Sequence, residues 1–62
     1  MSQDDYNKAF EDGLRAAALT AERTRDVFHQ RGREQEAEGA ERVRALIQDE
    51  LNWRARATEE NQ

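Results

Sequence analysis

The chain has 62 residues and a formal net charge of −4, with 39% charged and 35% hydrophobic residues and neither Cys nor Pro. A chain of this length forms at most one domain and is too short for the Rossmann or barrel folds of conventional enzymes. The lack of Cys excludes a disulfide scaffold and a thiolate metal site, and no apolar run approaches the roughly 18 residues of a membrane span.

The composition favours helix. Ala, Glu, Lys, Leu and Arg make up just over half of the chain, which is typical of long helices and coiled coils. The content of Leu, Ile, Val and Phe is low enough for a disordered chain, but the net charge is too modest for that class. Strand-forming residues are scarce and do not alternate. We therefore predict a single all-α domain over residues 1–62.

The first predicted helix spans about residues 3–31. Ser2 is a suitable N-cap, because its hydroxyl can accept a hydrogen bond from a free amide of the first turn, and Asp4 and Asp5 suit the positive end of the helix dipole. Small and apolar residues then recur at spacings of three and four, which places them on one helix face. This stripe consists of Tyr6, Phe10, Gly13, Leu14, Ala17, Ala21, Thr24 and Phe28.

The periodicity stops after Phe28, and the turn is predicted near residues 31–34. Gly32 suits the position just beyond a helix end, where a positive φ is cheap only for Gly. Glu34 suits the positive end of a following helix. A break at Gly39 and one uninterrupted helix are the two alternatives.

The second predicted helix spans about residues 34–58 and is followed by a polar tail, residues 59–62. Its small and apolar residues again recur at spacings of three and four, and two charged residues fall among them. This second stripe consists of Ala40, Val43, Leu46, Ile47, Glu50, Leu51, Arg54 and Ala57, with Trp53 on its flank.

Folding back at Gly32 gives an antiparallel helical hairpin in which the numbers of facing residues sum to about 65. Ala17 and Ala21 are then expected opposite Ile47 and Val43. A two-helix hairpin buries only one seam, so we expect hairpins to self-associate into a homodimer or a larger helical bundle. The residues predicted to form the core of this assembly are Phe10, Leu14, Ala17, Ala21, Phe28, Val43, Leu46, Ile47 and Leu51.

The residues that could carry chemistry are sparse. Catalysis needs a nucleophile with a base and an orienting acid, and the two hydroxyl candidates, Thr20 and Thr24, lie on the predicted packing face. A metal ion needs several ligands, but His29 has no second His and no Cys beside it. We expect an exposed helix-end histidine there, and we predict no catalytic residue, no metal and no cofactor.

Glu50 and Arg54 form the most informative polar pair. They lie four residues apart, in the favoured order for a helical ion pair, and they fall within an apolar stripe. The simpler interpretation is an ion pair at the edge of the seam. The alternative is a ligand pocket between protomers, in which Tyr6 and Trp53 stack a nucleotide-like anion while Arg54 binds its charge.

Arginine outnumbers lysine nine to one, and the basic residues are densest near the turn. Arg recognises phosphates and carboxylates, but a GC-rich genome produces the same bias without function. The candidate anion-binding patch consists of Arg23, Arg25, His29, Arg31 and Arg33. An acidic run, residues 34–41, follows it directly. A protein that grips duplex DNA shows one continuous basic face, so we exclude duplex DNA as a partner.

These patterns favour a non-enzymatic interaction protein, cytoplasmic because acidic residues rather than a signal peptide follow the N-terminus, and without a membrane partner. Its size is typical of phage or mobile-element products, and we expect it to bind and block a host partner protein, with exposed Leu19 as a candidate contact. One alternative is a protein that sequesters a nucleotide-like anion between protomers. The other is a structural subunit of a larger assembly.

Overall fold

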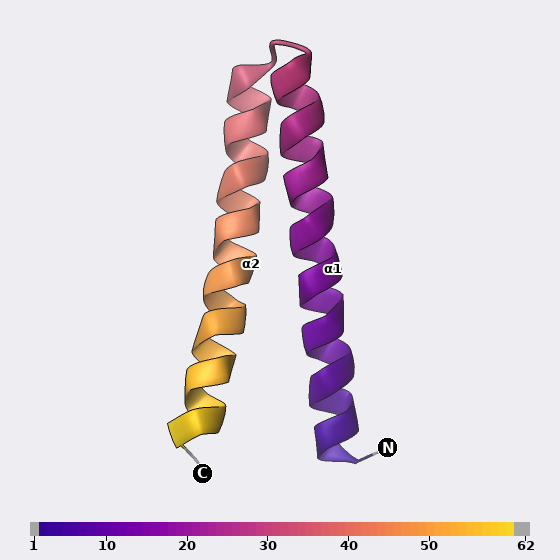
Figure 1. The fold of residues 1–62 in the computed structure, drawn as a ribbon, viewed down its shortest axis with the longest axis vertical. Helices are drawn as coiled ribbons and strands as arrows, with labels where there is room; N and C mark the ends of the chain where they lie inside the picture. Colours follow the sequence, from indigo (N-terminus) through magenta and orange to yellow (C-terminus); the bar gives the residue numbers. More distant parts are fainter. Residues whose placement is uncertain (1, 61–62) are drawn as a thin grey trace.

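The protein is a hairpin of two antiparallel helices lying side by side (Figure 1). The computed structural model describes residues 2–60, in which helix α1 spans Gln3–Gln30 and helix α2 spans Glu34–Glu60. This confirms the predicted all-α helical hairpin. The Cα atoms occupy 46 × 23 × 11 Å, so the molecule is a single flat layer of helices. Among the described residues, neither helix is long and apolar enough to span a membrane.

Both ends of α1 form as predicted from Ser2 at its start and Gly32 beyond its end. The Asp5 backbone N–H donates to Ser2 Oγ at 3.2 Å, which makes Ser2 the N-cap of α1. At the turn, the Arg33 N–H donates to the Phe28 carbonyl at 2.9 Å and the Gly32 N–H to the His29 carbonyl at 3.1 Å. This pair of bonds is a Schellman motif, and it requires the left-handed conformation that Gly32 adopts, with φ of 73°.

The turn therefore lies at residues 31–33, as predicted from Gly32. The alternative break at Gly39 is wrong, because α2 continues through that residue without interruption. Helix α2 also extends to Glu60, two residues beyond its predicted end. The rest of the predicted polar tail, residues 61–62, lies outside the described residues.

The seam between the helices follows a repeat of seven residues, in alternating steps of four and three. Its half-buried residues are Asn7, Glu11, Leu14, Ala18, Ala21, Arg25 and Phe28 in α1, and Ala40, Arg44, Ile47, Leu51 and Arg54 in α2. Ala37 also lies on the seam and is 4% exposed, the one buried residue of the part of the chain that is described. Small alanines near the turn allow the helices to approach closely there.

The register agrees with the predicted sum of about 65. Arg25 of α1 bonds Glu41 of α2, and the Arg54 guanidinium lies over the Phe10 ring. The predicted seam pairs Ala17–Ile47 and Ala21–Val43 do not form as predicted, because Ala17 and Val43 are exposed while Ala21 and Ile47 are half-buried. The seam is rotated toward one edge of each predicted stripe. Of the predicted core residues, Leu14, Ala21, Phe28, Ile47 and Leu51 are half-buried, whereas Phe10, Ala17, Val43 and Leu46 are exposed.

Candidate interaction surface

The rotation of the seam leaves most large apolar side chains in solvent. The exposed fraction is 57% for Tyr6, 63% for Trp53 and 69% for Leu46. Phe10, Val27 and Val43 are also exposed. Fully burying one such side chain contributes about 1.5–3 kcal/mol, so the single hairpin leaves a large part of its hydrophobic stabilisation unused.

These six residues share one side of the hairpin. Each lies one position before a seam residue: Tyr6 before Asn7 in α1, for example, and Leu46 before Ile47 in α2. Because antiparallel helices are related by a twofold rotation perpendicular to their common plane, the same offset in both helices leads to the same side. We call this side the apolar face, defined by Tyr6, Phe10, Val27, Val43, Leu46 and Trp53.

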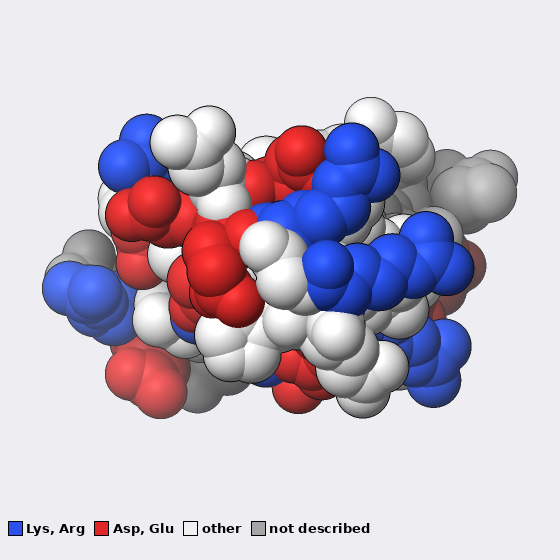
Figure 2. Space-filling model, turned by 90° about the horizontal axis from the view of Figure 1, so that it is seen from above, with Lys and Arg blue, Asp and Glu red and all other residues white. Residues whose placement is uncertain are grey.

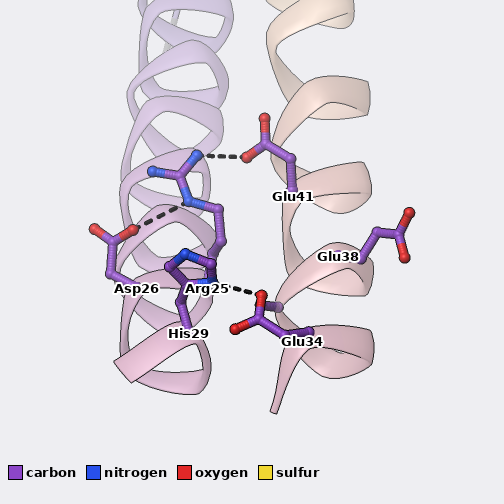
Figure 3. Close-up of a pocket in the computed structure, with 7 residues that line it drawn as sticks. Arg25, Asp26, His29, Glu34, Glu38 and Glu41 are labelled. Carbon is purple, nitrogen blue, oxygen red and sulfur yellow. Dashed lines mark hydrogen bonds and ion pairs between the residues drawn. The ribbon is translucent and has the colours of Figure 1, made fainter. Parts of the chain in front are cut away.

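The opposite side carries an open groove of about 540 Å³ near the turn, with Ala37 in its lining (Figure 3). We call this side the charged face, defined by Arg25, Asp26, His29, Glu34, Glu38 and Glu41. Leu19 lies on the same side, two helical turns before Asp26, and its exposed fraction is 45%.

Ion pairs across the groove join the two helices. Arg25 Nη1 donates to Glu41 Oε2 at 2.6 Å, while Arg25 Nε donates to Asp26 Oδ1 at 3.1 Å. His29 Nδ1 lies 2.6 Å from Glu34 Oε2 (Figure 3). Arg25 and His29 therefore each already have an acidic partner.

Glu41 is the centre of this network. It accepts from Arg44 Nη2 at 2.6 Å as well as from Arg25, and the two guanidinium groups lower the pKa of Glu41 from 4.5 to about 2. The same contacts raise the pKa of Arg44 and of Arg25. Sequence reasoning missed Arg44 altogether. Its signal is the seven-residue spacing that places Arg44 between Ala37 and Leu51 on the seam.

The predicted anion patch is not one open site. Arg25 and His29 pair with acids in the groove, and Arg33 pairs with Glu36 at 2.8 Å. Arg23 and Arg31 are exposed. Viewed from the turn end, acidic side chains gather at the left and centre of the view, and basic side chains lie mainly at the right, with others at the left edge (Figure 2). This end therefore presents mixed charge rather than a continuous basic face.

The predicted ligand residues lie near the open end of the hairpin. Arg54 Nε donates to Glu50 Oε1 at 3.2 Å, which confirms the predicted helical ion pair. The Arg54 guanidinium carbon also lies 4.4 Å from the centre of the Phe10 ring. Tyr6 stacks on Phe10 with 6.4 Å between ring centres. The structure thus brings Tyr6, Arg54 and Glu50 to one end, with Arg54 already engaged by an acid and a ring.

Trp53 and Arg54 also line a shallow pocket of about 180 Å³, together with Asn7, Glu11, Ala57 and Thr58. His29 is exposed at the helix end, as predicted. No group of three or more His, Cys, Asp or Glu side chains suited to a metal ion exists within residues 2–60.

Comparison of the chain with protein-family models, with curated proteins and with solved structures finds no match.

Proposed function

We propose that this protein is a non-enzymatic interaction protein that acts as an assembly of hairpins and binds a partner protein, occupying the surface of that partner. The observation that carries the proposal is the distribution of apolar side chains. Of the residues whose burial the structure describes, Ala37 alone is buried in the single hairpin, while six large apolar side chains share one exposed face. A flat layer of two helices becomes a stable core when a second layer covers it.

The charged face supports the second part of the proposal. It combines exposed Leu19 with acidic and basic groups, among them the Arg25–Glu41 pair at 2.6 Å. Complementary charges across a protein interface give it specificity more than raw affinity. This face stays accessible when the apolar face is covered, because the two lie on opposite sides of the helical layer.

The sequestering alternative is supported less well. Binding an anion at Arg54 would compete with Glu50 at 3.2 Å and with the Phe10 ring. A panel of nucleotides that raises the Tm of the wild type but not of Arg54→Ala would favour this alternative over partner binding.

Sedimentation equilibrium at micromolar concentration, together with far-UV circular dichroism, tests the assembly. We expect a helical species with at least twice the mass of the chain. A fully helical monomer would contradict the proposal, because it would show that the exposed apolar face needs no cover.

Partner binding is tested by native mass spectrometry of protein purified from its own host. We expect a stoichiometric protein partner on the wild type and its loss from Leu19→Asp, a variant that keeps the assembly. Leu46→Asp is the comparison variant, which we expect to lose the assembly. Equal capture by the wild type and by Leu19→Asp would contradict the assignment of the charged face.

A further inference from the structure

The apolar face is self-complementary, and this property indicates what covers it. We propose that a second copy of this chain covers the apolar face, with α1 of each protomer stacked on α2 of its partner and both turns at the same end of a four-helix bundle. This inference rests on the proposed function, because it specifies how the hairpins assemble. It adds the surface, the number of copies and their relative orientation.

The area of the face suits a second copy. The hairpin layer measures 46 by 23 Å between Cα atoms, so each broad side offers roughly 1,000 Å². A stable protein interface of standard size buries about 800 Å² on each partner. One further hairpin of the same dimensions therefore covers the face and satisfies that requirement.

The polar groups on this face are already satisfied within each chain. Thr20 Oγ1 donates to the Ala16 carbonyl at 3.0 Å, and Thr24 Oγ1 donates to the Thr20 carbonyl at 2.8 Å. Glu50, which lies between Leu46 and Trp53 along α2, is paired with Arg54 at 3.2 Å. A second hairpin can therefore cover the face without leaving these hydroxyls or this carboxylate unpaired.

The sizes of the side chains favour one orientation. Along the apolar side of α1 the central residues are small, namely Gly13, Ala17, Thr20 and Thr24. A Cβ added at Gly13 would meet nothing within 4 Å. Along the same side of α2 the exposed apolar residues beyond Gly39 are large, namely Val43, Leu46 and Trp53. Stacking α1 on α2 therefore places large side chains over small ones, as interdigitated packing requires.

The register makes this match specific. Facing residues of one hairpin sum to about 65, as the Arg25–Glu41 and Phe10–Arg54 contacts show. When both turns lie at the same end, this sum also holds between protomers. Leu46 then falls at the level between Ala17 and Thr20 of the partner, and Trp53 at the level between the partner's Phe10 and the partner's Gly13.

The opposite orientation, with turns at opposite ends, fits the face poorly. It would stack α1 on α1 and α2 on α2. The small centre of α1, around Ala17, would face its own copy across a gap. The two helix pairs would also require different separations, although they belong to the same rigid layer.

Nitroxide labels measure the orientation directly, because the chain has no Cys of its own. A label on Arg31→Cys marks the turn, and a label on Asp4→Cys marks the open end. Helices packed in contact lie about 10 Å apart, so both label pairs are expected within about 30 Å once their linkers are included. Turns at opposite ends would instead separate the Arg31 labels by nearly the hairpin length of 46 Å, and this result would overturn the orientation.

Two glutamate variants test the surface independently of the labels. Leu46→Glu places a charge on the apolar face and should raise the dimer dissociation constant by about a hundredfold. Leu19→Glu makes the same change on the charged face and should leave that constant within about threefold of the wild type. The opposite ranking would overturn the choice of face while leaving the assembly itself intact. A fully helical monomeric wild type would instead refute the proposed function, so the two failures are distinguishable.

Discussion

At the residue scale, Glu41 joins the two helices near the turn. Its carboxylate bonds Arg44 of its own helix and Arg25 of the other, which makes it the acid whose charge matters most to the hairpin. Because its pKa falls from 4.5 to about 2 on folding, the native state favours the ionised form. The resulting stabilisation is fully present above about pH 4.5 and is lost as the pH falls toward 2.

We therefore expect the Tm, followed by circular dichroism, to fall by several degrees between pH 5 and pH 2 in the wild type. Glu41→Gln should lower the Tm at pH 7 and reduce the fall of the Tm between pH 5 and pH 2. Glu38→Gln is the matched control, because Glu38 pairs with Arg42 within α2 at 3.7 Å and is highly exposed. The same fall of the Tm between pH 5 and pH 2 in all three proteins would refute the role of Glu41.

Trp53 offers a second test at this scale, since it is the one tryptophan of the chain and its exposed fraction in the single hairpin is 63%. If a second copy covers the apolar face, Trp53 fluorescence should be blue-shifted and protected from a soluble quencher at high protein concentration. Leu46→Glu should restore the red-shifted, quenched emission. Equal quenching of the wild type and of Leu46→Glu would place Trp53 outside the interface.

At the scale of helices, the sequence predicts the elements better than it predicts their rotation. Ser2, Gly32 and the absence of Pro suffice for the two helices and their turn, because caps and breakers act over a few residues. The rotation of each helix about its axis depends on which of two possible faces packs against the other helix. Both a stripe containing Leu46 and a seam containing Ala37 satisfy the spacing of three and four, and the close approach of small alanines near the turn favours the second.

In the candidate site, too, contacts within one helix are predictable from the sequence, whereas contacts between the helices are not. The Glu50–Arg54 pair is predictable because both residues belong to one helix and lie one turn apart. The pairing of Arg25 with Glu41 needs the register between helices, and neither residue belongs to the apolar pattern. Long Arg side chains can cover a seam with their aliphatic stems while their charged tips find an acid. Hydrophobic periodicity alone does not detect that arrangement.

Two glycine substitutions test the assignment of the turn. Gly32→Ala should lower the free energy of unfolding by about 1–2 kcal/mol, because φ of 73° is strained for a residue with a Cβ. Gly39→Ala should raise the free energy of unfolding of the hairpin by about 0.5–1 kcal/mol, because Gly39 lies inside α2 and a Cβ there meets nothing within 4 Å of the same chain. Urea unfolding at fixed protein concentration measures both changes. Effects of the same sign would argue against a turn at Gly32.

At the scale of the whole molecule, a layer 11 Å thick between Cα atoms has no interior of its own. Assembly should therefore be coupled to folding, and each tenfold dilution should remove about 1.4 kcal/mol of free energy per dimer. The Tm should rise steadily with protein concentration for the wild type and for Leu19→Glu. A Tm that is independent of concentration would mean that one hairpin folds without a second.

In the proposed orientation, the stability of the dimer should depend on salt. Residues 17–47 contain equal numbers of acidic and basic side chains, so the net charge of −4 lies in the half of the hairpin away from the turn. Turns at the same end bring two such acidic halves together, whereas turns at opposite ends would set each against a neutral half. Raising the salt from roughly 0.01 to 0.1 M shortens the Debye length from about 30 to about 10 Å and screens this repulsion.

The dimer dissociation constant, measured by sedimentation equilibrium at pH 7, should therefore fall as salt is added. Glu41→Gln controls for the ion pairs within each hairpin, which salt weakens, and should show the same trend. A dissociation constant that rises with salt in both proteins would contradict an orientation in which the acidic halves meet.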